Sequence, residues 1–277
     1  MKKGLWLGFL LAGLVGCSGI SMGLRFADLL AMRQISRFFD LDSARRERAR
    51  ADFGEGLAKL RREEFPRIAA TLSNFADAVE KNRVGGRAGI ERLWNDVQAH
   101  FRAASLNFEA LGQNLVEGES ARGFAKFDAE FAATQRKEQE RVQDPERERE
   151  QMRKRAERAV KESVEKLRDP QMAMLEGAIA ADPPQAPLRA ESRRHLFSQF
   201  QAARTDPVAR KAFVRRFFAD WDGLQTKTYL EARQRRHARY VDLVTKIFES
   251  LDAEQKENLI RNLRRRADEL RSLASIS

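Results

Sequence analysis

Apolar residues recur along most of this chain at intervals of three and four, the spacing that gathers side chains on one face of an α-helix. An early stripe of this kind, with polar residues between its members, consists of Met22, Phe26, Leu29, Leu30, Phe38 and Leu41. The sequence has no sustained alternation of period two and no Asn-Gly or Asp-Gly dipeptide between strand-like runs. The pattern therefore predicts an all-α fold, a multi-helix bundle of antiparallel helices without a sheet.

Helix starts are marked by aspartates that can accept hydrogen bonds from free backbone N–H groups. Asp144, Asp169 and Asp206 each precede a proline, which is tolerated at the first helical position because its N–H is not needed there. Asp252 is followed three residues later by Gln255, the arrangement of a capping box. We expect all four aspartates to begin helices, and we interpret them as folding signals rather than as catalytic acids.

Glycine and proline clusters predict the breaks between these helices. The stretch 182–187 is the candidate for a boundary within a single helical domain 22–277, and an ordinary inter-helix loop is the alternative. Pro66 predicts either a kink or a new helix. Residues 135–158 are almost entirely charged and predict one long, solvated helix with a narrow packing face.

The amino terminus has the regions of a secretory signal peptide. Two lysines precede the apolar stretch 4–16, which is too short to span a bilayer as a helix. The stretch leads into Leu14-Val15-Gly16-Cys17, which resembles a bacterial lipobox. The resemblance implies that residues 1–16 are a lipoprotein signal peptide, cleaved between Gly16 and Cys17, and that Cys17 carries lipid with acyl chains such as palmitate. An uncleaved signal anchor, with Cys17 as a small buried residue, is the alternative.

Lipidation of Cys17 would place the mature chain in the cell envelope. Ser18 follows the cysteine where an inner-membrane retention signal would have Asp, so we expect the outer membrane, facing the periplasm. Residues 17–21 form a short lipidated tether, which reaches about 14 Å when extended and holds the next residues near the lipid. We favour a core-facing helix for the stripe that begins at Met22, and the closeness of the anchor keeps a helix lying on the membrane as the alternative.

The sequence offers little that is typical of catalysis. Phosphate-binding loops, zinc-protease motifs and serine-hydrolase motifs are absent from it. Its one cysteine rules out a disulfide framework, and its three histidines, His100, His195 and His237, share no metal-ligand spacing. We predict a non-enzymatic protein with no catalytic residue, no metal and no cofactor apart from the covalent lipid on Cys17.

Positive charge is concentrated in the last third of the chain. The formal net charge of +11 becomes +9 without the signal peptide, and the segment from Arg189 to Ser277 contains 20 basic and 12 acidic residues. The candidate basic binding face consists of Arg215, Arg216, Arg235, Arg236, Arg264, Arg265 and Arg266. The expected compartment disfavours nucleic acid, so anionic lipid headgroups or an acidic protein client are the expected partners. A solvated face without any ligand is the alternative.

Several strings beyond the lipobox resemble an uncharacterised family of proteobacterial lipoproteins that shares a domain of unknown function. They are Phe26-Ala27-Asp28, Arg37-Phe38-Phe39-Asp40-Leu41-Asp42, Arg61-Arg62-Glu63-Glu64-Phe65-Pro66-Arg67 and Ser250-Leu251-Asp252-Ala253-Glu254-Gln255. The resemblance extends over nearly the whole mature chain and implies no catalytic residues. A Trp-His pair found in that family is replaced here by Lys59-Leu60.

A second resemblance concerns a short motif. Leu251-Asp252-Ala253-Glu254-Gln255 is similar to the Leu-Thr-x-x-Gln motif of periplasmic proteins of the Spy type, and Leu167-Arg168-Asp169-Pro170-Gln171 is a weaker match. Our leading hypothesis is a non-enzymatic outer-membrane lipoprotein that binds a protein or the envelope surface. One alternative, implied by the motif, is an ATP-independent periplasmic holdase or stress protein. Another is a structural or assembly factor of envelope complexes.

Overall fold

The computed structural model describes residues 26–275, and all regular structure in this range is helical. The elements are α3 (Ala27–Phe38), α4 (Ser43–Lys59), η2 (Leu60–Glu64), α5 (Phe65–Glu80), α6 (Gly86–Leu106), α7 (Glu109–Val116), α8 (Ala121–Val142), α9 (Pro145–Ser163), α10 (Asp169–Ala180), α11 (Ala186–Ala203), α12 (Pro207–Ala219), η3 (Asp222–Leu224), α13 (Lys227–Glu249) and α14 (Ala253–Ala274). The predicted all-α fold is therefore confirmed. Among the helices described, none combines the length and the hydropathy that crossing a bilayer requires.

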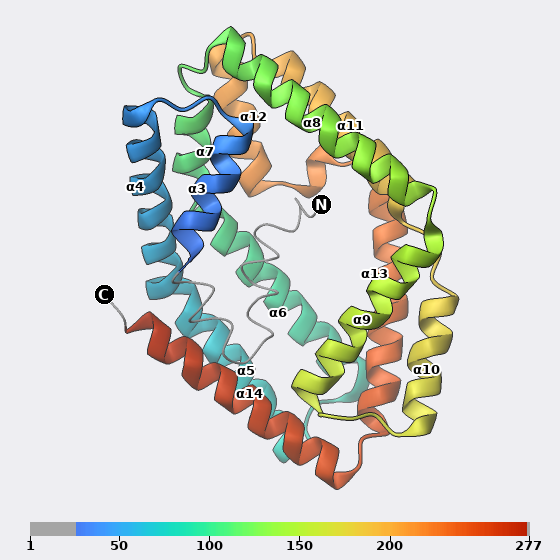
Figure 1. Cartoon of the computed structure of the whole chain (residues 1–277). Coiled ribbons are helices and arrows are strands. Elements are labelled where there is room, and N and C mark those ends of the chain that lie inside the picture. The colour runs from blue at the N-terminus through green and yellow to red at the C-terminus, as the bar shows by residue number, and fades with distance from the viewer. Residues whose placement is uncertain (1–25, 276–277) are drawn as a thin grey trace.

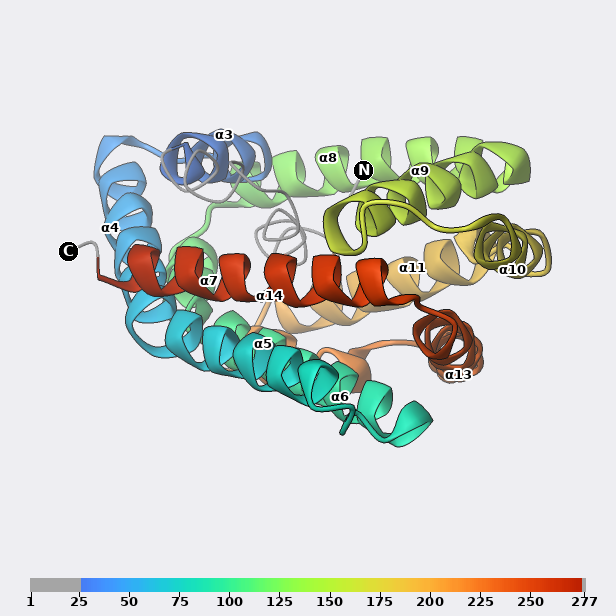
Figure 2. The ribbon, with the colours of Figure 1, turned by 90° about the horizontal axis from the view of Figure 1, so that it is seen from below.

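The helices follow a closed ring, which Figure 1 shows face-on. Its sides are formed by contacts between α5 and α14, between α8 and α11, and between α10 and α13. α6 runs across the ring and contacts both α12 and α13. In the edge-on view of Figure 2, α3, α8 and α9 lie along one side of the molecule and α5 and α6 along the other.

The most extensive helix contact joins α5 to α14. Ala69 and Ala76 of α5 and Ala267 of α14 are completely buried, and such small side chains let two helices approach closely. Arg264 of α14 pairs with Asp77 of α5 at 2.8 Å, across a separation of 187 residues in the sequence. The ring is thus closed by a contact between an early helix and the last one.

The described residues form four apolar clusters. The largest lies among α3, α4, α5, α7 and α14 and includes Phe53, Phe65 and Leu270, which are almost completely buried. Another is rich in phenylalanine and lies where α8 meets α11. There the rings of Phe131 and Phe197 stack with centroids 3.8 Å apart. Burial of these large side chains supplies most of the favourable free energy of folding.

Three of the four predicted aspartate caps are present. The side chains of Asp144, Asp206 and Asp252 accept backbone N–H groups at the starts of α9, α12 and α14. Asp169 does not cap: it is the first residue inside α10, and the side chain of Gln171 accepts the preceding backbone N–H at 2.9 Å. The glutamine therefore makes the reciprocal bond of a capping box, to the N-cap residue Arg168, and the predicted aspartate cap is absent.

The charged segment 135–158 forms parts of two helices, so the prediction of one long helix is wrong. α8 ends at Val142 because Pro145 has no N–H with which to continue its hydrogen bonds. Asp144 then accepts the Arg147 N–H at 3.0 Å and starts α9. α9 has no fully buried residue, and it packs through a narrow row of partly buried apolar side chains.

Candidate functional site

The seven arginines of the predicted basic face are distributed over three helices. Arg215 and Arg216 lie on α12, Arg235 and Arg236 on α13, and residues 264–266 on α14. Figure 1 shows these helices on different sides of the ring. Folding therefore spreads the positive charge over the molecule and does not gather it on one surface.

Arg236 anchors the loop that joins α10 to α11. The carboxylate of Asp182, in the stretch 182–187, is 4% exposed and forms ion pairs of 2.8 Å with both Arg236 and Arg239. The sequence marked Arg236 as a binding residue only because it lies in a basic run. Its observed contacts give it the role of fixing this loop to α13.

Arg266 closes the end of α9. Its guanidinium donates to the backbone carbonyl of Glu162 at 2.9 Å, and the neighbouring Asn262 donates to the carbonyl of Ser163 at 2.8 Å. The last carbonyl groups of a helix have no partner within the helix, so α14 supplies the donors that α9 lacks. Arg266 therefore also has a structural role.

Arg215 and Arg216 on α12 and Arg235 on α13 are more exposed. Arg215 lies 3.4 Å from Glu109, and Arg216 and Arg235 each lie 3.8 Å from a carboxylate on their own helix or just beyond it. Exposed pairs of this length contribute little to stability, typically below about 1 kcal/mol. These side chains are available to solvent.

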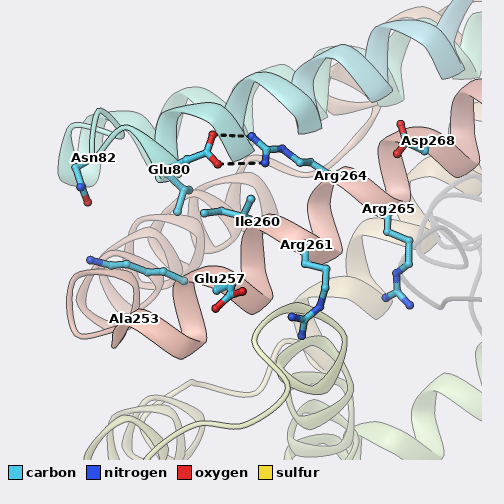
Figure 3. A pocket seen from close by; sticks show the side chains of 11 residues that line it. Glu80, Asn82, Ala253, Glu257, Ile260, Arg261, Arg264, Arg265 and Asp268 are labelled. Atoms are coloured by element: carbon cyan, nitrogen blue, oxygen red, sulfur yellow. Dashed lines mark hydrogen bonds and ion pairs between the residues drawn. The ribbon is translucent and has the colours of Figure 1, made fainter.

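An open depression of about 780 Å³ lies beside α14, and the carboxyl end of α5 forms one of its walls (Figure 3). Its charged lining consists of Glu80, Lys256, Glu257, Arg261, Arg264, Arg265 and Asp268. Arg264 points to α5, where it pairs with Glu80 at 2.7 Å and holds the pKa of that carboxyl below its usual range. In Figure 3, Arg261 and Arg265 extend away from α5.

Cations outnumber carboxylates in this lining, and the depression is broad and open. Enclosed pockets with an apolar lining suit small ligands, whereas an open charged surface suits a macromolecular partner of opposite charge. Of the predicted basic residues, Arg264 and Arg265 take part in this site. Lys256 and Arg261 also line it, although neither belongs to the predicted basic face.

A buried carboxylate organises the corner where α8, α9 and α11 meet. The side chain of Glu138 is fully buried and accepts hydrogen bonds from Arg189 and Arg193 at 2.7 Å and from Arg141 at 3.3 Å. Burial by itself would raise its pKa, but the surrounding guanidinium groups outweigh burial and hold the pKa of Glu138 below the usual value. The cluster has the features of a structural ion network.

A polar trio lies beside the turn η2. His100 Nε2 is 2.9 Å from Thr71 Oγ1, and His100 Nδ1 is 3.4 Å from a carboxylate oxygen of Glu64. The order of groups resembles a hydrolase triad. However, Thr71 lies in the middle of α5, where backbone N–H groups are occupied by the helix and cannot stabilise an oxyanion. We interpret the trio as a contact that joins η2, α5 and α6.

The turn η2 is itself a consequence of Pro66. Proline has no N–H and its ring clashes with the carbonyl four residues before it. The chain avoids this clash with one π-helical turn, in which the N–H of Phe65 bonds to Leu60 five residues earlier. A new helix, α5, does begin at Phe65 and contains Pro66 in its first turn, but no loop precedes it, so α4, η2 and α5 are continuous.

The two glutamine motifs, 84 residues apart, meet in the structure. Gln171 and Gln255 are both buried, and each donates its amide N–H to the side-chain oxygen of the other, at 3.1 and 2.8 Å. Each also donates to a backbone carbonyl of the opposite turn, Ser250 for Gln171 and Lys166 for Gln255. The motifs thus lock the α9–α10 turn against the α13–α14 turn.

The predicted lipid site lies outside the described residues, because Gly16 and Cys17 precede residue 26. Within 26–275, His, Cys, Asp and Glu side chains form no group that could hold a metal ion. Comparison with known proteins identified no relative: no family model, curated protein or solved structure matches this chain.

Proposed function

We propose that this chain is a non-enzymatic lipoprotein that is anchored in the outer membrane, faces the periplasm and binds a protein partner. The lipobox-like string ending in Cys17 carries the proposal, because it combines an apolar stretch, a small residue and the only cysteine of the chain at the spacing that lipidation needs. Several acyl chains on one residue anchor a protein stably, whereas one chain does not.

The depression beside α14 is the surface that supports protein binding best. Its cations extend from a helix that is held rigidly by α5, so partner binding there requires little ordering of the backbone. An acidic segment of another envelope protein has the charge that Lys256 and Arg265 would attract. It would compete with Glu165 for Arg261, which pairs with that glutamate at 2.8 Å. A protein that binds such a segment would act as an assembly factor or a structural component of an envelope complex, with a defined partner.

A holdase function is the alternative. The similarity to the Leu-Thr-x-x-Gln motif favours it, but the motif's glutamines are buried in contact with each other and are not available to a client. An apolar binding surface would have to lie elsewhere on the molecule. Purified protein that fails to delay aggregation of an unfolded client at low salt would remove this alternative.

The anchor is tested in cells grown with labelled palmitate. We expect the wild-type chain to be labelled and to fractionate with the outer membrane, whereas Cys17→Ala should be unlabelled and retain its signal peptide. Equal labelling of the two chains would contradict the lipobox.

Partner binding is tested in the same cells with a photocrosslinking amino acid in place of Arg265. The matched control replaces Lys227, whose side chain is 92% exposed on α13. We expect a stoichiometric crosslinked protein from position 265 and none from position 227. The same yield at both positions, or none at either, would contradict a binding site beside α14.

A further inference from the structure

The N-cap residue and the first turn of α3 leave a row of large apolar side chains uncovered. Phe26, Leu29 and Leu30 are 52%, 64% and 49% exposed. They stand at positions i, i+3 and i+4, so they share one face of the helix, and the exposed Arg33 continues the row at i+7. In the rest of the described chain, large exposed apolar side chains are spread over α6, α10, α12 and α13. We call Phe26, Leu29, Leu30 and Arg33 the α3 stripe.

The α3 stripe is not the face through which the helix packs, so the prediction of a core-facing stripe is wrong for Phe26, Leu29 and Leu30. Ala27, Ala31 and Met32 of α3 are buried in the main core with α4, α5, α7 and α14. A surface helix with one buried face normally has polar residues on the other. Contiguous exposed apolar residues of this kind mark a surface that contacts a protein or a membrane.

Charge near the stripe favours an anionic surface. Asp28 is the one carboxylate of α3, and Arg50 of α4 neutralises it through an ion pair of 3.1 Å. Arg33 is exposed at the carboxyl side of the stripe. An apolar row followed by a cation is the arrangement in which side chains enter the acyl region while the guanidinium remains among lipid phosphates.

The position of the anchor selects the bilayer as the occupant. Cys17 precedes Phe26 by nine residues, so the two are separated by at most about 30 Å of extended chain. Of the described helices, α3 follows the lipidated residue most directly in the sequence. Resting on the proposed anchor, we infer that the α3 stripe inserts into the membrane surface and orients the helical ring on it.

The experiment uses the mature lipidated chain in vesicles of phosphatidylethanolamine and phosphatidylglycerol. Because Cys17 is acylated, an added cysteine is the only free thiol, and Leu29→Cys receives an environment-sensitive fluorophore. Val208→Cys, at a side chain that is 76% exposed on α12, is the matched control. Brominated acyl chains then quench a probe that lies in the lipid.

We expect quenching at position 29 to exceed that at position 208 by at least about twofold, because inserted side chains lie about 5–10 Å into the interface. Exchanging Phe26 and Leu30 for serine should abolish the difference without releasing the protein from the vesicles. Equal quenching at both positions, or crosslinking of position 29 to a protein, overturns the inference while the anchor stands. Failure to sediment with vesicles overturns the anchor and the inference together.

Discussion

Replacing Glu138 with glutamine should destabilise the protein by about 3 kcal/mol at neutral pH. The substitution conserves volume but removes the charge that Arg141, Arg189 and Arg193 share. Loss of one member of a fully buried ion pair costs about 3–5 kcal/mol. The lower end applies here, because the side chains of Arg193 and Arg189 are 15% and 24% exposed and are partly solvated.

Urea unfolding followed by circular dichroism measures the effect. The variant's midpoint should fall with an unchanged m-value, and its melting temperature should fall by about 6–12 °C for a chain of this size. Glu140→Gln is the control, since Glu140 is exposed on the same helix, and it should change stability by less than about 0.5 kcal/mol.

The effect has a defined dependence on pH. The pKa of Glu138 is lower in the folded protein than its ordinary value of 4.5, so its contribution is fully present above that value. Below it the unfolded chain takes up the proton first, and the contribution falls as the pH drops towards the folded pKa. The difference between wild type and Glu138→Gln should therefore be smaller at about pH 3.5 than at neutral pH. Equal midpoints for Glu138→Gln and Glu140→Gln at neutral pH would refute the reasoning.

Two further substitution pairs test the ring. Gln255→Leu removes the donor to the buried Gln171 side-chain oxygen and to the Lys166 carbonyl, and it should cost about 2–3 kcal/mol. The double variant with Gln171→Leu should cost less than the sum of the single variants. Additive costs in urea unfolding would show that the amides do not interact. Gly54→Ala should raise stability by about 0.5–1 kcal/mol, because a Cβ at Gly54 meets no atom within 4 Å inside α4. Gly89→Ala should lower stability by about 1–3 kcal/mol, because its Cβ would lie 1.7 Å from the Val84 carbonyl oxygen; equal melting temperatures for the two glycine variants would contradict the packing at Gly89.

Local sequence signals predicted the helices well. Asp206 and Asp252 cap helices because a carboxylate beside free N–H groups acts within a few residues and needs no distant partner. The failure at Asp169 is also local, since this carboxylate lies inside α10, one position past the N-cap residue Arg168. Periodicity alone also predicted the all-α class, because the spacing of apolar residues along one helix needs no distant partner.

The roles of charged side chains could not be predicted in this way. Arg236 and Arg266 lie in basic runs, and only the folded ring brings Asp182 and the end of α9 to them. Glu138 lies within a charged run that indicated solvent exposure. A signal was present there, because Glu138 stands seven residues after Phe131 on the same helical face, and a carboxylate on an apolar stripe indicates a buried charge.

The pairing of α5 with α14 has a consequence for how the chain folds. Contacts such as Asp77 with Arg264 join residues 187 positions apart, whereas most helical proteins fold through contacts between neighbours in sequence. α5 cannot bury its alanine face until α14 has been synthesised. A chain interrupted before Ala253 would therefore keep an exposed apolar surface, so proteolysis should remove incomplete chains while sparing finished ones.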